Sequence, residues 1–538
     1  MTDSSAASTT SSETGASRVG TNILWNYISG FTSIFGLLLL YPFAIAIVGS
    51  DSYGLWVITF GAIQLLTMSD FGLGTGIVRT LTDLPDDAAH HERRRSFVGV
   101  ALGVFLVLAV ALTAVYFAVF PLYLTTVKVP EQDRHAVVPL LLAAGFTLFF
   151  SVLGRACNSI LWALNRPDIE RKAAVVSIFA RGAGYALLIP LHGGLIALVL
   201  VECVSILIPP LVCFWGVHRR FGVPRTLPGA WREQGRPLLR MSSVLSIGSL
   251  SLLGVYQLPL FIVGPALGLH AATAFGALMR VFQSSRLVVS WISLPFAYPI
   301  KKSQGAQAAE HIRTATTISL LVGLLLSVPL LAIPTELLTV WLGDPMAFAA
   351  PALAMVVVGV LGEALGQVPN LVLTLRGSPL LASLISLATL VVTLPAVWLA
   401  ATTGDLQLVM LASVGPLLLA VPVQVLFSER AEPSGVTAGL VRTWALMTAG
   451  AAVAVAAFTA LGRVLPPIPT IAVCAVVLGA VFLGAFRIIR RRDRAINEGG
   501  AAPDEAAEAA ETVGLAPVGA AATSEPDAGT GGGAGRTS

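Results

Sequence analysis

The chain has 538 residues, of which 55% are hydrophobic and only 12% are charged, and its mean hydropathy is +0.83. An average globular protein carries about twice that charged fraction, so this composition excludes an ordinary soluble enzyme. The net charge of +4 does not indicate nucleic-acid binding, because the basic residues gather in short segments between long apolar stretches. We therefore predict an all-α polytopic membrane protein with no nucleic-acid partner.

The first 18 residues are polar and rich in Ser, Thr and Ala, and we expect them to be disordered. The apolar stretch that follows is too long for the hydrophobic region of a cleavable signal peptide, so we expect it to stay as an uncleaved membrane anchor. The four cysteines stand singly in apolar segments, without the spacing of a zinc site. The sequence therefore predicts no metal site and no bound cofactor.

Hydropathy predicts about fourteen transmembrane helices, since roughly 20 apolar residues in a helix cross the hydrocarbon core of a bilayer. The tenth is expected to be irregular, because it contains Gly362, Gly366 and Pro369. The predicted spans are residues 20–44, 55–79, 97–121, 137–164, 172–191, 193–217, 241–263, 271–298, 314–334, 350–375, 378–400, 405–427, 440–461 and 467–489.

Lysine and arginine are distributed unevenly over the loops between these spans. If residue 1 is cytoplasmic, the outer loops contain only Lys128, Arg134 and Arg463. This is the asymmetry that the positive-inside rule requires, so both termini are predicted to be cytoplasmic. Arginine is far commoner than lysine and the chain is rich in Ala and Gly, which is typical of a GC-rich bacterial genome. We therefore expect a multi-pass protein of a bacterial plasma membrane.

Residues 20–83 form a predicted hairpin of two spans joined by a short polar break. A weak echo returns after Ser246, where Ile262-Val263-Gly264 matches Ile47-Val48-Gly49. Because six spans separate the two hairpins, both enter the membrane in the same orientation, which predicts two pseudo-symmetric six-helix bundles and two further helices. The predicted domains are a disordered N-terminus at 1–18, bundles at 19–217 and 241–427, an inter-bundle loop at 218–240, the last two helices with a basic end at 428–494, and a disordered tail at 495–538.

Seven charged residues fall well inside the predicted spans, away from their ends. A charge at the bilayer centre costs roughly 2.5–3.5 kcal/mol on insertion scales, so these side chains should face an interior cavity or one another. Asp70, toward the inner third, is expected to cap a kink or to pair with Arg79. The seven residues are Arg155, Arg181, Arg280, Arg286, Asp70, Glu202 and Glu363.

Other polar residues share helix faces with these charges. Ser151, Arg155, Asn158 and Trp162 follow steps of three and four, which place them along one stripe of the fourth span. Glu363, Gln367 and Asn370 do the same in the tenth span. Stripes on several helices favour a central polar cavity with a slight cationic excess. The alternative is that arginines and acids simply pair, Arg181 with Glu202 for instance, and hold neighbouring helices together.

This chain resembles the oligosaccharide flippases of the MOP superfamily, the Wzx-type polysaccharide biosynthesis proteins. The resemblance rests on GSDSYGLW and SDFGLGTGIVR in the opening hairpin, on LGRACNSILWALNRPDI at the end of the fourth span, and on FGALMRVFQ in the eighth. It covers roughly residues 20–490 in layout. It implies a non-enzymatic carrier that moves a polyprenyl-diphosphate-linked oligosaccharide to the outer leaflet, in contact with membrane lipids and alongside polysaccharide polymerases or glycosyltransferases.

The resemblance also assigns roles to the polar residues of the spans. A diphosphate would bind to the cationic cavity, because arginine binds phosphate groups in bidentate fashion and stays charged. Glu202, Glu363 and Asp70 are candidates to take up a coupling proton or sodium ion. The implied diphosphate ligands are Arg155, Arg181, Arg280 and Arg286. The implied partners of sugar hydroxyls are Asn26, Asn158, Gln257, Gln367 and Asn370.

Two other functions remain open at this point. A MATE-like, cation-coupled antiporter of small organic molecules would have a cavity dominated by acidic or aromatic residues, and the arginines count against it. A membrane polysaccharide polymerase or ligase would carry a large outer catalytic loop, whereas every predicted outer loop here is short. We therefore favour the flippase and predict that the chain is not an enzyme.

Overall fold

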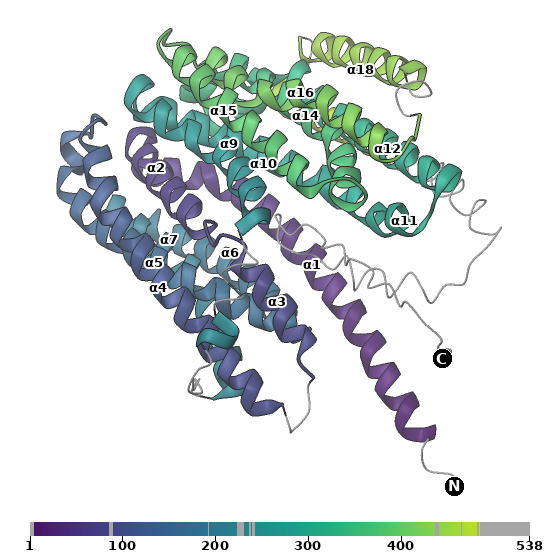
Figure 1. The fold of residues 1–538 in the computed structure, drawn as a ribbon. Helices are drawn as coiled ribbons and strands as arrows, with labels where there is room; N and C mark the ends of the chain where they lie inside the picture. The colour runs from purple at the N-terminus through teal and green to yellow at the C-terminus, as the bar shows by residue number, and fades with distance from the viewer. Residues whose placement is uncertain are drawn as a thin grey trace, which may run out of the picture.

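The computed structural model describes residues 5–85, 90–191, 193–222, 231–235, 238, 243–435, 441–463, 465–480 and 484. All regular elements in these ranges are helices. Helices of the N-terminal half pack into one bundle and those of the C-terminal half into a second, and α1 runs beside both (Figure 1). The all-helical membrane fold predicted from the sequence is confirmed.

The N-terminal bundle is built from long apolar helices with short connections. The 3-10 helix η1 (Glu131–Ala136) precedes α5, and a short π-helical turn, η2 (Trp231–Gly235), follows α7. The helices are α1 (Ser5–Val48), α2 (Ser50–Thr67), α3 (Leu73–Asp83), α4 (His91–Leu124), α5 (Val137–Ala163), α6 (Asp168–Leu188) and α7 (Leu195–Phe221).

The C-terminal bundle repeats this plan with additional short helices at its connections. These are η3 (Leu294–Phe296), α11 (Ala297–Lys302), α13 (Pro334–Leu342) and η4 (Asp344–Ala349). The long helices are α9 (Ser243–Leu267), α10 (Leu269–Ser293), α12 (Gly305–Ala332), α14 (Ala350–Leu375), α15 (Pro379–Ala401) and α16 (Leu406–Ala431).

Two further helices lie beyond the second bundle. α18 (Val441–Gly462) packs on α12 (Figure 1), and a shorter apolar helix spans Pro467–Ala480. Phe458 of α18 and Cys474 of the last helix share a small apolar cluster with Val328 of α12. The predicted tail at 495–538 lies outside the described residues.

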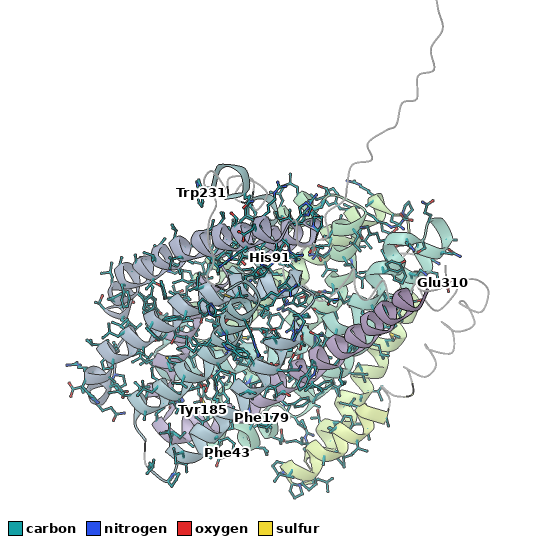
Figure 2. The ribbon with its side chains drawn as sticks, turned by 90° about the horizontal axis from the view of Figure 1, so that it is seen from below. Phe43, His91, Phe179, Tyr185, Trp231 and Glu310 are labelled. Carbon is teal, nitrogen blue, oxygen red and sulfur yellow. The ribbon has the colours of Figure 1, made fainter. Side chains whose placement is uncertain are left out.

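Nine helices of the described ranges are long and apolar enough to cross a membrane. Two further predicted spans, α6 and α10, carry arginines in their middle turns, which lowers their mean hydropathy. Large apolar side chains cover the surface of the molecule, as expected for contact with lipid. Phe43 and Phe179, labelled in Figure 2, are 48% and 69% exposed.

The structure corrects the predicted match between the two halves. α1 passes into α2 through Gly49 with φ +82°, and α9 passes into α10 through Gly268 with φ +90°. Both turns require the positive φ that glycine adopts without strain. Gly49 is therefore equivalent to Gly268 rather than to Gly264, which lies inside α9. We call the end of the molecule that holds these two turns the outer end, and the opposite end the inner end.

Three of the differences from the predicted spans have a clear physical reason. α1 begins at Ser5 rather than near residue 20, because a helix anchored by an apolar span extends without a new nucleation cost. The second predicted span is broken into α2 and α3 at Phe71 and Gly72, which have φ of +51° and +72°. α14 is continuous across Pro369, since close packing against α16 holds the helix together.

The two bundles are joined by hydrogen bonds at the outer end. The Ser50 hydroxyl lies 2.7 Å from His270 Nδ1, and the Thr273 hydroxyl donates to the Ser50 carbonyl at 2.6 Å. Tyr41 donates to the Thr273 carbonyl at 2.8 Å. At the inner end α3 and α11, which belong to different bundles, lie apart (Figure 1). The bundles therefore meet most closely at the outer end.

Candidate functional site

The first group of charged residues, which we call the central cluster, consists of Arg181, Glu202 and Arg280. It lies where the two bundles meet, farther from the outer end than the hydrogen bonds that join them. Arg280 of α10 projects toward the N-terminal bundle, and its guanidinium carbon is 5.1 Å from the ring centre of Phe60 on α2. It also lies within electrostatic range of Tyr41, Tyr53 and the Arg181–Glu202 pair. It lies eleven residues along from Leu269, the first residue of α10, and so about 17 Å from the outer end, near mid-membrane.

Arg181 and Glu202 face each other across α6 and α7. Arg181 Nε is 3.2 Å from Glu202 Oε2, an ion-pair distance without the alignment of a hydrogen bond. The Tyr185 hydroxyl, one turn along from Arg181, donates to Glu202 Oε1. All three residues are buried. The pairing that we considered as an alternative is therefore present.

The central cluster has one more cation than acid. Among the residues that the structure describes, it holds the guanidinium groups of Arg181 and Arg280 and one carboxylate, that of Glu202. A guanidinium buried without a counter-ion is costly in a low-dielectric environment. An anion placed between the two arginines would remove that cost and would gain charge-assisted hydrogen bonds.

A second cluster lies within the C-terminal bundle. Tyr256 of α9 donates to Glu363 of α14 at 2.5 Å, and Arg286 of α10 stacks on the Tyr256 ring at 4.7 Å. Arg286 Nε is buried without a hydrogen-bond partner. Gln367 and Asn370 continue this face of α14 toward the inner end and are half-buried. In this cluster the positive charge of Arg286 is matched by the negative charge of Glu363, and Tyr256 contacts both side chains.

A third cluster connects the α2–α3 break to α5. Arg155 Nη2 is 3.2 Å from Asp70 Oδ2, and the backbone N–H of Gly72 donates to Asp70 Oδ1 at 3.1 Å. Asp70 thus caps the break, as predicted, but its ion-pair partner is Arg155 instead of Arg79. The reason is that Arg79 lies on the exposed side of α3, whereas Arg155 faces the break from α5.

The predicted site residues thus fall into three clusters rather than one. Asn158 shares the α5 face with Arg155, and the Gln257 amide oxygen lies against Gly61 of α2, between the bundles. Asn26 is buried in α1.

Apart from Tyr185, which its spacing from Arg181 already placed on the same helix face, the prediction missed the aromatic side chains near these charges. The tyrosines at 53, 185 and 256, together with Phe60, contact or lie near the charged groups in the spans. Tyrosines are common at membrane interfaces for other reasons, so the sequence offered only their depth in the spans as a signal.

One titratable group outside the spans has a clear shift. Asp168 opens α6 at the inner end, 3.1 Å from Arg166 Nε and 2.9 Å from Lys172 Nζ. Burial opposes ionisation of this carboxyl, but the hydrogen bonds from Lys172 and Arg166 outweigh it and lower the pKa of Asp168 below its usual value. Within the described ranges, no group of three or more His, Cys, Asp or Glu side chains is placed to hold a metal ion.

Solved structures similar to this chain are membrane transporters. The lipid II flippase MurJ, in an inward closed conformation, has a TM-score of 0.64 at 11% identity, over 86% of this chain and 98% of that protein. An inward-facing multidrug resistance MATE family transporter of the MOP superfamily has a TM-score of 0.57 at 15% identity, over 76% and 94%. The eukaryotic MATE transporter AtDTX14 has a TM-score of 0.52 at 13% identity, over 78% and 99%.

No protein-family model and no curated protein matches the sequence. At the identities of these solved structures, the likeness concerns the fold alone. The chain therefore has the all-helical fold of MOP-superfamily transporters.

Proposed function

We propose that this protein is a flippase that moves a polyprenyl-diphosphate-linked oligosaccharide from the cytoplasmic to the outer leaflet of a bacterial plasma membrane. The observation that carries this proposal is the cationic excess of the central cluster, at the contact between the bundles. Arg280 and Arg181 come from different bundles, so a diphosphate held between them would bind both halves of the molecule. A fork of N–H donors on each arginine suits the oxygens of a diphosphate.

The proposed mechanism is alternating access. With the bundles in contact at the outer end, the substrate head group would reach the central cluster from the inner end while its lipid tail stays in the bilayer. Rocking of the two bundles would then open the outer end around the same site. Both termini are proposed to lie in the cytoplasm, with the two bundles moving as the units at 19–217 and 241–427.

The coupling ion, if one is used, would bind to Glu363. Asp70 and Glu202 each lie against an arginine, at 3.2 Å in both cases. Glu363 accepts a hydrogen bond from a neutral tyrosine. Among the described residues no ion pair joins it to a basic side chain, and on this ground we assign the coupling ion to it.

The test is flipping of a fluorescent polyprenyl diphosphate in proteoliposomes that contain the full chain. Arg280→Gln should lower the flipping rate at least about tenfold, since a charge-assisted contact is worth about 1.5–3 kcal/mol. Arg280→Lys should retain part of the rate because it keeps the charge. Arg79→Gln, which removes an exposed cation of α3, is the matched control and should flip at the wild-type rate. A wild-type rate in Arg280→Gln would refute the assignment.

A second candidate function, a MATE-like antiporter of small organic cations, is favoured by one observation. Glu363 is a half-buried acid in the C-terminal bundle, next to the aromatic ring of Tyr256. Carboxylates and aromatic rings are the groups that bind organic cations. Under this alternative, Glu363→Gln would abolish transport of a cationic dye, while Arg280→Gln would leave it intact or increase it.

The proposed partners follow from the proposed substrate. Glycosyltransferases would supply the lipid-linked oligosaccharide on the cytoplasmic side, and a polysaccharide polymerase would use it on the outer side. Cells that lack the protein should accumulate the glycosylated polyprenyl diphosphate and lose one surface polysaccharide, which lipid analysis of depleted cells would detect.

A further inference from the structure

The cluster around the α2–α3 break has features of a ligand site that the central cluster does not share. Helix α2 ends at Thr67 and α3 begins at Leu73, and between them Phe71 adopts a left-handed φ of +51°. A residue other than glycine in this region carries strain. A break in a membrane helix leaves backbone groups unpaired, and such breaks occur where the chain lines a polar cavity or is buried in protein. The strain and the break lie toward the inner end of the N-terminal bundle.

The two charges at the break itself form a neutral pair. Asp70 and Arg155 form an ion pair at 3.2 Å, and the second carboxylate oxygen of Asp70 accepts from Gly72. Neither charge is therefore left to attract an ion. This distinguishes the break from the central cluster, where arginines outnumber acids.

Four polar atoms, on α2 and on the stripe of α5 that carries Arg155, are buried without a hydrogen-bond partner. Three of the residues, Ser151, Asn158 and Trp162, share the stripe of α5 that carries Arg155, and Ser151 is only 8% exposed. The fourth is at the last residue of α2. A buried polar atom without a partner costs about 1–3 kcal/mol, and such atoms call for a water or a ligand. The atoms are Thr67 Oγ1, Ser151 Oγ, Asn158 Oδ1 and Trp162 Nε1.

These four atoms specify the chemistry of their ligand. The Asn158 amide oxygen needs a donor, the Trp162 N–H needs an acceptor, and the hydroxyls of Thr67 and Ser151 accept or donate. A phosphate or carboxylate offers only acceptors and would leave Asn158 unsatisfied. A neutral group with several hydroxyls offers both donors and acceptors, and it would not disturb the neutral Asp70–Arg155 pair.

We propose that the inner polar site, formed by Thr67, Asp70, Ser151, Arg155, Asn158 and Trp162, binds a short run of neutral sugar units of the transported molecule, because Ser151 and Trp162 lie about 17 Å apart along α5. This assignment rests on the proposed function for the identity of that molecule. The central cluster then holds the anionic diphosphate and the inner polar site holds part of the glycan. The two parts of one substrate are thus sorted by charge into two places, one between the bundles and one within the N-terminal bundle.

The test compares three probes on the full chain in lipid nanodiscs. The probes are farnesyl diphosphate, farnesyl diphosphate carrying one N-acetylglucosamine, and free N,N′-diacetylchitobiose. The wild type should bind the glycosylated diphosphate more tightly than farnesyl diphosphate. Ser151→Ala and Asn158→Leu should each lower that preference about five- to tenfold. Arg280→Gln should weaken the binding of both diphosphate probes and keep the preference for the glycosylated one.

Thermal unfolding without ligand separates binding from a structural role. Ser151→Ala and Asn158→Leu remove atoms that have no partner, so neither variant should lower the unfolding temperature. Ser159→Ala is the matched control on the same helix, because the Ser159 hydroxyl already donates to the Arg155 carbonyl at 3.0 Å. It should keep the wild-type preference for the glycosylated probe.

Failure of this proposal and failure of the proposed function give different results. If no diphosphate binds but chitobiose binds the wild type and not Asn158→Leu, the sugar site stands and the flippase substrate is wrong. If the wild type shows no preference for the glycosylated probe and no binding of chitobiose, the sugar site is refuted. Lower unfolding temperatures with an unchanged preference would also overturn it, since ordered water would then satisfy these atoms.

Discussion

At the scale of single residues, every acid in the spans is held by specific donors. Asp70 accepts from a backbone N–H and from Arg155, Glu202 from Tyr185, and Glu363 from Tyr256. This is the arrangement expected in a low-dielectric interior, where an unpaired carboxylate costs far more than a hydrogen bond contributes. The charges therefore hold the helices in register as well as forming candidate binding sites.

Asp168 provides a pH test of the inner end. Its pKa is lower in the folded protein, so its stabilising effect is present above the unfolded pKa near 3.9 and is lost as the pH falls through the folded pKa. Asp168→Asn should therefore cost about 1 kcal/mol of unfolding free energy at pH 7, a modest loss because Arg166 and Lys172 are half exposed.

Thermal unfolding of the wild type and of Asp168→Asn across pH 7 to pH 3 would measure this. The difference between the two should shrink toward the acid end. Asp51→Asn, which changes an exposed acid at the start of α2, should show no comparable difference. If the difference in stability between the wild type and Asp168→Asn stays constant with pH, Asp168 acts through packing rather than through its charge.

At the scale of helices, the contact between α2 and α10 closes the outer end. The two helices approach so closely that a Cβ atom on Gly54 would lie 2.3 Å from the carbonyl oxygen of Leu269. Small residues allow such approaches in membranes, where packing rather than the hydrophobic effect drives helix association. A single methyl group added at Gly54 should therefore disturb the packing of α2 against α10.

Gly54→Ala should loosen the outer end. Thr273 is fully buried beside Gly54, and the four native cysteines are also buried, so a Thr273→Cys variant reports on opening with little background. Adding Gly54→Ala to it should raise the rate of reaction with a membrane-impermeant maleimide several-fold. Gly103→Ala, where an added Cβ meets nothing within 4 Å, is the control, and an unchanged rate in Gly54→Ala would contradict the close approach.

At the scale of the whole molecule, the hydrogen bonds between the bundles gather at one end. Besides the bonds of Ser50, Tyr41 and Thr273, the Trp341 indole of the C-terminal bundle donates to the Leu38 carbonyl of α1 at 2.7 Å. Such a set holds the outer end shut, while the inner ends of α3 and α11 diverge (Figure 1). Under the proposed mechanism this is the state that accepts substrate from the cytoplasm.

Locking the outer end should stop transport. Cysteines at Ser50 and His270, whose side chains are 2.7 Å apart, would be joined by a short bis-methanethiosulfonate cross-linker. Flipping in proteoliposomes should fall to background after cross-linking and return on reduction, because the bundles could no longer separate. Each single cysteine variant, treated in the same way, should stay active. Undiminished flipping by the cross-linked protein would argue against rocking of the bundles.

The sequence by itself determined the class of fold. Long apolar segments must form helices in a bilayer because no water satisfies their backbone, and the spacing of Arg155 and Asn158 placed them on one face of one helix. Only the tertiary structure decided which charges meet. Asp70 pairs with Arg155 instead of Arg79, and Tyr256, 107 residues away in sequence, bonds Glu363. Periodicity describes one helix at a time, whereas partner choice depends on how helices far apart in sequence pack, and local residue patterns do not encode that packing.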